Sequence, residues 1–481
     1  MIHRRLRSLG RVSLSALLTA MLVTASAQPV AAEVRLAGIF TDNMVLQCDM
    51  PIYIWGTGEN GDEVAVAFGD QEEATTVNDG RWKVSLGAMS ANADPQKLVV
   101  SSGDDEIELT NVLIGEVWIA SGQSNMVWPI QRSADPEATA AAADVPQLRL
   151  FTVQRKPTPE PQGDLTGIGW HVTTPETVPE FSAVAYHFGR HLHEQLGVPV
   201  GLVSTNVGGT PAEAWTSREA LADEPSLKPL LDIEASRPTH NASVLYNAMI
   251  HPLVPMAFRG AIWYQGESNA GRAYQYRTLL RTMVQDWRSQ WGRDFPFLIV
   301  QLAPFRDIQP EPGDSQWAEL RESQLLVAQT TPPSALAVIT DIGDEKDIHP
   351  KQKAPVGTRL ALAARALAYG EDIEHSGPVY REMEIDGSRA ILHFDHLGGG
   401  LTTKGSDGPQ GFTICGADQK FVHADAKIEG DTLVVSSDQV AEPVAVRFGW
   451  ADYPVVDLWN EAGLPASPFR TDDFPLTTMP K

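Results

Sequence analysis

The sequence predicts an α/β core flanked by two β-rich modules, and three observations lead to this prediction. From residue 34 to about 109, short apolar runs alternate with tight-turn sequences such as Asn78-Asp79-Gly80, which is typical of paired strands. From about 112 to 370, apolar strands alternate with amphipathic helices, and this rhythm builds a mainly parallel sheet covered by helices on both faces. From about 376 onward, the strand pattern returns.

The N-terminal segment has the layout of a secretory signal peptide. Its start carries four arginines, an uncharged run follows at 12–23, and small residues lead to Ala27 and Ala32. The run is shorter than the roughly 20 residues that a membrane-spanning helix needs, and no later segment is long and apolar enough to span a membrane. We therefore expect cleavage after Ala27 or Ala32 and a periplasmic or secreted mature protein. A frayed or buried N-terminal helix is the alternative.

Composition excludes several classes of function. Removal of residues 1–32 takes away four of the 37 basic residues and none of the 61 acidic ones, which leaves a net charge of about −28. Such a surface repels phosphate backbones, so we expect no nucleic-acid partner. It also favours a neutral or sparsely charged substrate, unless the pocket differs from the surface around it. Only Cys48 and Cys415 are present, which excludes a disulfide scaffold and cysteine-rich metal sites, and we expect two unpaired thiols.

The chain divides into four expected segments. They are a signal peptide at 1–32, a β-sandwich-like module at 33–110, the core at 111–372 and a C-terminal β-rich module at 373–481. In the core we expect strands at 117–120, 200–204, 260–264, 297–302 and 335–340. We expect helices at 181–196 and 316–328, and a third helix that starts near Tyr276 and is closed by Gly292. The first of these helices has a helical apolar repeat, Ser182 to cap its start and Gly197 to end it.

A polar segment with a central serine follows the first core strand, at 121–126 (Ser-Gly-Gln-Ser-Asn-Met). A sharp turn there would expose the hydroxyl of Ser124 and present its backbone N–H to a substrate carbonyl oxygen, and Gly122 permits such a turn. The nucleophile elbow of α/β-hydrolases needs glycine where Met126 stands, so that fold is disfavoured. Taken alone, the segment fits a polar turn as well as an active site.

Two further segments could stabilise an oxyanion. The paired glycines Gly208 and Gly209 follow a strand and allow backbone N–H groups to approach a ligand, although a plain loop is the simpler interpretation. The segment 263–269 carries the amide side chains of Gln265 and Asn269, which could donate hydrogen bonds to an oxyanion. A buried structural network is the alternative for these amides.

The fourth segment, at 341–350, offers a general base. A serine hydroxyl is a poor nucleophile until a base removes its proton, and histidine suits that role near neutral pH, which makes His349 the candidate. A carboxylate must hold the imidazole in the correct tautomer. Asp347 is our choice for this carboxylate and Asp344 the alternative. A lone exposed histidine would be the ordinary interpretation of the loop.

All four segments follow expected strands, so one edge of the sheet can gather them. Together they resemble the SGNH hydrolases, specifically the sialate O-acetylesterase-like branch with its Gly-Gln-Ser-Asn-Met motif, which stands here at 122–126. The resemblance covers nearly the whole mature chain, including 36–40 and 463–470. It implies a flavodoxin-like three-layer α/β/α core. It also implies an exported esterase that removes O-acetyl groups from a carbohydrate and needs neither cofactor nor metal.

The resemblance further implies roles for particular residues. Ser124 is the expected nucleophile and His349 the base, while the backbone N–H groups of Ser124 and Gly209 form the oxyanion hole, with Gly208 as an alternative. Gln265 is the expected side-chain donor, with Asn269 as an alternative. A common SGNH pattern has the acid three residues before the histidine, where this sequence has Lys346. We therefore expect Asp347 to be the acid.

We expect Trp215, Asn125 and Arg321 to contact the substrate. Trp215 could stack on a sugar ring and Arg321 could bind a carboxylate, whereas core packing and a structural salt bridge are the alternatives. Sialic acid, xylan and xyloglucan side chains all fit the sequence as carriers of the acetyl group. The oligomeric state is not predicted.

Three other functions have weaker support. His187 and His191 have a zinc-binding spacing, but Phe188 stands where a metalloprotease needs glutamate. Glu213 and Glu267 could be imagined as a glycosidase pair. A non-catalytic carbohydrate-binding protein is the third alternative, but it has no need of a complete serine, histidine and acid set.

Overall fold

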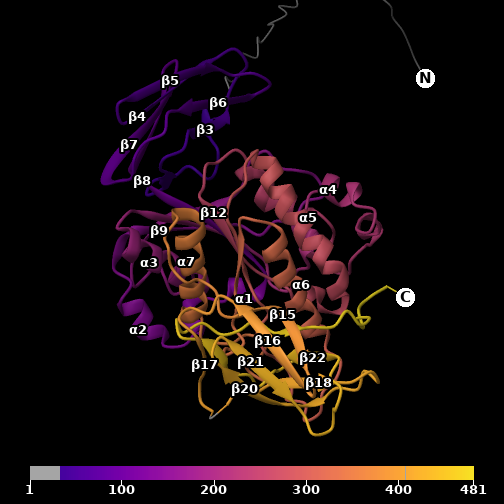
Figure 1. Cartoon of the computed structure of the whole chain (residues 1–481). Coiled ribbons are helices and arrows are strands. Elements are labelled where there is room, and N and C mark those ends of the chain that lie inside the picture. The colour runs from indigo at the N-terminus through magenta and orange to yellow at the C-terminus, as the bar shows by residue number, and fades with distance from the viewer. Residues whose placement is uncertain (1–32, 407, 481) are drawn as a thin grey trace, which may run out of the picture.

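A mixed sheet of 11 strands extends from the N-terminal part of the chain into its α/β core (Figure 1). The computed structural model describes residues 33–406 and 408–480, so the expected signal peptide lies outside the described residues. Across the core the strand order is β10-β9-β11-β8-β12-β13-β14. These strands are β8 (Asp105–Gly122), β9 (Val145–Val153), β10 (Gly167–Thr173), β11 (Val200–Asn206), β12 (Gly260–Tyr264), β13 (Phe297–Val300) and β14 (Ser334–Ala337).

All neighbours from β9 to β14 run parallel, and only β10 is antiparallel to its neighbour. If β9 and β10 are set aside, the strands β11-β8-β12-β13-β14 have the order 2-1-3-4-5, which is that of flavodoxin-like sheets. The expected α/β fold class is therefore confirmed.

Helices cover both faces of this sheet. Trp118 and Ala120 of β8 point to the face packed against α3 (Ala183–Leu196) and α7 (Ala354–Tyr369). Val117 and Ile119 point to the face packed against α5 (Ala273–Trp291) and α6 (Gln316–Thr330). Successive side chains of a strand alternate between faces, so one apolar strand supplies two cores. The result is the expected three-layer arrangement.

Shorter helical segments connect the layers. They are α1 (Ser124–Val127), η1 (Ile130–Arg132), α2 (Pro136–Ala141), η2 (Ala212–Trp215), α4 (Arg218–Asp223), η3 (Lys228–Asp232), η4 (Pro238–His240), η5 (Tyr246–Ile250), η6 (His251–Leu253) and η7 (Glu267–Arg272). The predicted long helices form where the local signals place them. In α3 the Ser182 hydroxyl accepts a hydrogen bond from the Ala185 N–H at 3.2 Å, and Gly197 ends the helix in a left-handed conformation. The strands β9 and β10 were not predicted.

The N-terminal module shares a strand with the core. Its strands are β1 (Arg35–Leu36), β2 (Val45–Gln47), β3 (Ile52–Thr57), β4 (Glu63–Phe68), β5 (Gln71–Thr76), β6 (Arg81–Leu86) and β7 (Asn92–Ser102). Three of these strands form a separate sheet in the order β1-β3-β6. In contrast, β2 and β7 pair with β8 of the core. Every residue of β8 from Val112 onward is buried. The boundary expected at residue 110 therefore falls inside one continuous strand.

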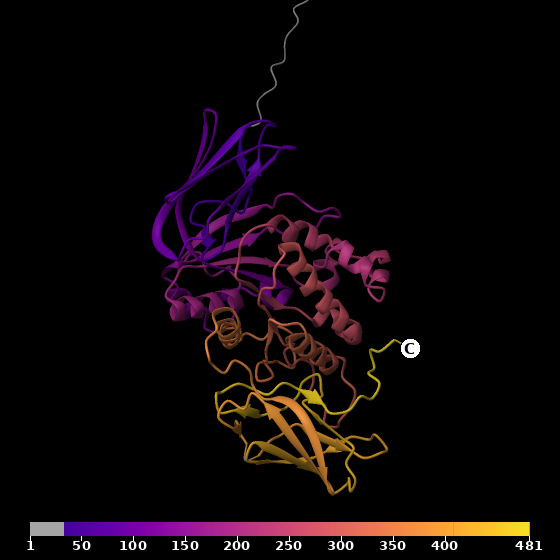
Figure 2. The same ribbon diagram turned by 45° about the horizontal axis from the view of Figure 1, so that its top comes forward.

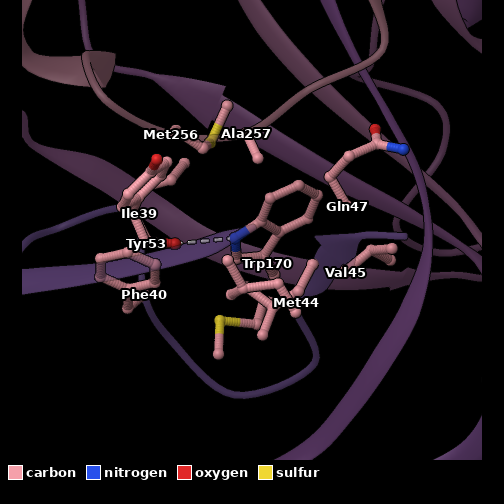
Figure 3. Close-up of a pocket in the computed structure, with 11 residues that line it drawn as sticks. Ile39, Phe40, Met44, Val45, Gln47, Tyr53, Trp170, Met256 and Ala257 are labelled. Atoms are coloured by element: carbon pink, nitrogen blue, oxygen red, sulfur yellow. Dashed lines mark hydrogen bonds between the residues drawn. The ribbon is translucent and has the colours of Figure 1, made fainter. Parts of the chain in front are cut away.

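Trp170 of β10 lies where the N-terminal module meets the core. Its indole N–H donates a hydrogen bond to the carbonyl of Ile39 at 2.8 Å (Figure 3). Mainly apolar side chains surround it and enclose a cavity of only about 20 Å³. Such a space holds about one water molecule, so this pocket is a packing gap and cannot hold a sugar.

The C-terminal module lies at the opposite end of the core from the N-terminal module (Figure 2). Its strands are β15 (Val379–Asp386), β16 (Arg389–Asp395), β17 (Leu401–Thr403), β18 (Phe412–Cys415), β19 (Val422–His423), β20 (Asp425–Glu429), β21 (Thr432–Ser436), β22 (Ala445–Phe448), β23 (Leu458–Asn460) and β24 (Phe469–Arg470). Two four-stranded antiparallel sheets, β15-β16-β21-β20 and β19-β18-β22-β24, enclose an apolar core around Phe412, Phe448 and Phe469.

The state of the two cysteines and a search for membrane-spanning helices complete the description of the fold. Cys48 and Cys415 are both buried and unpaired. Within residues 33–406 and 408–480, no helix combines the length and the apolar character needed to cross a membrane.

Candidate active site

The carboxyl ends of three neighbouring strands meet at the candidate site. β8 ends at Gly122, and this residue is in register with Asn206 of β11 on one side and Tyr264 of β12 on the other. The strand order reverses at β8, because β9 to β11 lie on one side of it and β12 to β14 on the other, and open α/β sheets bind ligands in the crevice at such a point. The segments that carry Ser124, Gly209 and Gln265 begin at this crevice.

Ser124 starts α1 directly after the turn formed by Gly122 and Gln123. Gly122 has a φ of +138°, and a Cβ atom there would lie 2.2 Å from the carbonyl oxygen of Tyr264. Only glycine allows β8 and β12 to approach so closely. The Gln123 side chain accepts hydrogen bonds from the N–H groups of Gly266 and Ser268 at 3.4 and 3.3 Å. The turn is thus anchored to the segment after β12, and Ser124 stays half-buried at its end.

The paired glycines lie beside the serine. A Cβ atom on Gly208 would lie 3.6 Å from the Ser124 Cβ, so the Gly208 backbone is in close reach of the nucleophile segment. Gly209 has a φ of +74°, and its carbonyl accepts a hydrogen bond from the Ser268 hydroxyl at 2.8 Å. In the part of the chain that the structure describes, no acceptor engages the N–H of either glycine. Both N–H groups are therefore available to an oxyanion.

The loop after β14 brings His349 to the same crevice. The imidazole is stacked on the indole of Trp128, with ring centroids 4.8 Å apart and planes inclined by 14°. Its Nδ1 lies 3.3 Å from Oδ1 of Asp347, which also accepts the His349 backbone N–H at 2.9 Å. Asp344 accepts hydrogen bonds from the N–H groups of Lys346 and Asp347, at 2.8 and 3.1 Å, and so caps the loop.

One hydrogen bond joins the Ser124 segment to the histidine loop. The Asn125 side-chain amide donates to the carbonyl of Ile348 at 3.0 Å. Asn125 follows Ser124 and Ile348 precedes His349, so this bond joins the two segments immediately next to the serine and the imidazole. The structure thus brings Ser124, His349, Asp347 and Gly209 into one neighbourhood.

The electrostatic surroundings favour a neutral imidazole. Burial lowers the pKa of His349 below its ordinary value, and the positive charge of Lys353 acts in the same direction. The carboxylate of Asp347 partly opposes this shift. The lowered pKa favours the unprotonated imidazole, which is the form that can accept a proton.

Two of the residues that we expected to contact substrate are interior residues. Arg321 has no exposed surface, and its guanidinium donates to the backbone carbonyls of Leu302, Ala303, Ala451 and Asp452. Its role is to join the core to the C-terminal module. Trp215 is also fully buried and donates to the hydroxyl of Thr210 at 3.0 Å. The expectation that these residues touch a sugar was wrong, because buried side chains cannot reach a ligand.

The expected amide donors are engaged within the protein. Both N–H groups of Gln265 are used, toward Asn269 Oδ1 at 2.7 Å and the Thr210 carbonyl at 3.2 Å. Asn269 in turn donates to Glu213 at 3.0 Å. Asn125 is fully buried, so the expectation that it binds substrate was wrong as well. A role of Gln265 in an oxyanion hole would require this network to open.

The sequence interpretation missed Lys353, which is buried beneath the site. Its ammonium group donates to Asn125 Oδ1 at 2.6 Å. It stands four residues after His349, directly before α7. A lysine on a polar loop normally lies in solvent, so the sequence alone carries no sign of its burial.

The alternative chemistries find little support. Glu213 is paired with Arg272 and bound to Asn269, and Glu267 has a buried carboxylate, so the two cannot flank a sugar as glycosidase acids do. In the described ranges, three possible metal-ligand side chains converge only at Cys48, Asp49 and Glu116. Among the described residues, His187 and His191 therefore have no third metal-ligand side chain beside them.

Comparisons with known proteins show consistent similarities. Residues 114–366 match the family described as "Carbohydrate esterase, sialic acid-specific acetylesterase". Sialate O-acetylesterase of Homo sapiens is 30% identical over 486 residues, which cover 90% of this chain and 92% of the human protein. The Mus musculus enzyme is 29% identical over 511 residues, covering 90% and 94%. The crystal structure of a carbohydrate acetylesterase from Xanthomonas citri has a TM-score of 0.86 and 41% identity, and the match covers 92% of this chain and 100% of that chain.

Proposed function

Because the chain belongs to the family of sialic acid-specific acetylesterases, and is thus a carboxylic ester hydrolase, we propose that it deacetylates a carbohydrate by a Ser-His-Asp mechanism. Ser124 attacks the acetyl carbonyl while His349 takes its proton, and Asp347 stabilises the resulting imidazolium. The sugar hydroxyl leaves with that proton, and water then hydrolyses the acetyl group from Ser124. The chemistry requires neither metal nor cofactor.

The observation that carries this proposal is the bond from Asn125 to Ile348. It joins the neighbours of Ser124 and His349 at 3.0 Å, although the two segments are more than 200 residues apart in the chain. If the segment at 121–126 were only a polar turn and His349 only an exposed histidine, no bond between the two segments would be expected. The 3.3 Å contact between His349 Nδ1 and Asp347 Oδ1 adds the third member.

Backbone N–H groups stabilise the oxyanion in this proposal. The donors are those of Ser124 and Gly209, with Gly208 as the alternative for the second. The free N–H groups of the two glycines and the proximity of Gly208 to the serine support this assignment. Backbone donors are held in place before the reaction, so they need no reorganisation as charge develops on the acetyl oxygen.

The charges around the crevice favour an acidic sugar as the carrier of the acetyl group. Arg132 lies over Trp128 at 5.1 Å, Arg155 donates to the Asn206 carbonyl at 3.1 Å, and a Cβ atom on Gly209 would lie 3.9 Å from Arg237. Among the described residues, none of these three arginines forms an ion pair with an acidic side chain. A sugar carboxylate such as that of sialic acid can therefore find a partner here, in contrast to the acidic composition of the chain as a whole. Xylan and xyloglucan acetates are the alternative substrates.

We also propose that the protein is exported through residues 1–32 to the periplasm or the medium. The basic start, the uncharged run and the small residues before Ala27 and Ala32 support this proposal. N-terminal sequencing of the mature protein tests it. A protein that keeps Met1 after expression in an exporting host would contradict it.

The central experiment compares the wild type with Ser124→Ala on acetylated substrates. We expect Ser124→Ala to lose at least about three orders of magnitude in kcat while it keeps its fold by circular dichroism. A serine-directed organophosphate should label Ser124 in the wild type, and EDTA should leave activity unchanged. The wild type should prefer O-acetylated sialic acid to acetylated xylan. A folded, active Ser124→Ala protein overturns the mechanism, and a preference for xylan overturns the substrate assignment.

A further inference from the structure

A buried amide lies between two opposite charges directly beneath the candidate active site. Asn125 Oδ1 accepts a hydrogen bond from Lys353 Nζ at 2.6 Å, and Asn125 Nδ2 donates to Glu267 Oε1 at 2.6 Å. The second N–H of the same amide donates to the carbonyl of Ile348 at 3.0 Å. The partners come from two segments, since Ile348 and Lys353 belong to the histidine loop and Glu267 to the segment after β12, and together the bonds occupy both N–H groups of the amide.

This cluster is shielded from water. Asn125 has no exposed surface and Lys353 is only 1% exposed. The Lys353 ammonium group lies 5.3 Å from the centre of the Tyr264 ring, and the second carboxylate oxygen of Glu267 is buried with no hydrogen-bond partner among the described residues. Burial lowers the pKa of Lys353 to about 7 and raises the pKa of Glu267, because each charge has lost its water. Their mutual attraction across the amide opposes both shifts.

The two charges determine which way the amide faces. If the amide of Asn125 were turned over, its NH₂ group would meet the ammonium of Lys353, and its oxygen would meet the carboxylate of Glu267 and the carbonyl of Ile348. Three attractive contacts would become three repulsive ones, and inside a protein such contacts are costly. The lysine and the glutamate therefore hold Asn125 in the one orientation that allows its bond to Ile348.

This orientation bears directly on the distance between the serine and the imidazole. Asn125 is bonded covalently to Ser124, and Ile348 to His349, so any change in the Asn125–Ile348 bond moves the two against each other. We propose that Lys353 is a positioning residue for the esterase reaction, which acts through Asn125 to hold Ser124 and His349 in register. This inference rests on the proposed function of that pair.

Lys353 also affects the proton affinity of the base. The charged and titratable groups that face it are Glu267 of η7, Tyr264 of β12 and, on its own loop, Asp347 and His349. His349 is further influenced by Arg132 of η1. A positive charge at Lys353 disfavours the imidazolium, so removal of this charge raises the pKa of His349. The acid limb of the pH profile of kcat/KM should then move to higher pH.

The test compares Lys353→Met, Lys353→Arg and the matched control Lys351→Met, with 4-nitrophenyl acetate as substrate. Lys351 is exposed two residues away on the same loop. For Lys353→Met we expect kcat to fall about 10- to 100-fold, as a small misalignment of reacting groups does, with KM within about threefold of the wild type. Its acid limb should move to higher pH. Lys353→Arg should keep the limb in place, and Lys351→Met should match the wild type.

Two outcomes for Lys353→Met overturn the inference. One is a folded variant with the kcat of the wild type. The other is a lower kcat with an unmoved acid limb, since a purely structural residue gives that result. If Lys353→Met does not fold, the double variant Glu267→Gln/Lys353→Met, which removes both buried charges together, decides by the same two criteria. Ser124→Ala reports separately on the proposed function, so failure of one proposal is distinguishable from failure of the other.

Discussion

Replacement of Asp347 by asparagine tests which carboxylate serves His349 in the proposed mechanism. Asp347 Oδ1 lies 3.3 Å from His349 Nδ1, whereas the contacts of Asp344 are with the backbone N–H groups of its own loop. Asparagine keeps the shape of the side chain. Its NH₂ group, however, favours the wrong imidazole tautomer, and it has no charge to stabilise the imidazolium that forms as Ser124 attacks.

The distance and the exposure of Asp347 together give the expected size of the effect. Coulomb's law for two unit charges 3.3 Å apart gives about 1 kcal/mol in water and about 5 kcal/mol at an effective dielectric constant of ~20. The side chain of Asp347 is 44% exposed, so solvent screens the pair and the lower half of this range applies. We expect a loss of about 2–3 kcal/mol in transition-state stabilisation, which lowers kcat about 30- to 150-fold.

The assay is steady-state hydrolysis of 4-nitrophenyl acetate by Asp347→Asn and Asp344→Asn, with circular dichroism as the control for folding. Asp344→Asn weakens only a loop cap, so its kcat should stay within about threefold of the wild type. If Asp344→Asn is crippled and Asp347→Asn is nearly normal, the roles of the two residues are reversed. If neither change matters, the enzyme uses a Ser-His dyad and our reasoning about the carboxylate is refuted.

Two further predictions follow from the geometry of the site. Because burial lowers the pKa of His349 and only its neutral form accepts a proton, kcat/KM should fall on the acid side with a midpoint below 6.5. A profile measured from pH 4 to 9 with a midpoint above that value contradicts this expectation. Gly122→Ala should reduce the free energy of unfolding by about 2–4 kcal/mol, because its Cβ atom would collide with the Tyr264 carbonyl at a positive φ. Urea unfolding measures this loss, and a variant as stable as the wild type would count against the tight approach of β8 and β12.

Much of the fold could be read from local patterns. Ser182 and Gly197 mark the ends of α3, and the apolar runs of β11 and β12 begin at the predicted residues, because capping and alternation depend on neighbours within a few positions. The resemblance to sialate O-acetylesterases drawn from the motif at 122–126 is confirmed by the comparisons. The boundary expected at residue 110 lies inside β8, since a strand that passes from one sheet to another leaves no break in its pattern.

For the site too, local sequence patterns indicated some residues, whereas burial by distant parts of the chain could not be predicted. Ser124, His349 and Asp347 were predicted from the sequence as site residues because their loops follow strands, and strand ends in a parallel sheet converge. Arg321, Trp215 and Asn125 were placed wrongly around the substrate, since burial is decided by parts of the chain far away in sequence. Arg321, for example, binds carbonyls of the C-terminal module.

By itself, the sequence determined the fold class and the family, and it supplied the residues that we propose to carry the chemistry, because these depend on residue type and short-range spacing. Only the tertiary structure decided which polar side chains are buried and what each of them contacts. Lys353 and Asn125 are 228 positions apart and meet at 2.6 Å beneath the site, because the sheet brings the ends of distant strands together. No local pattern contains that contact, since the hydrogen bond is needed only because the fold buries both groups away from water.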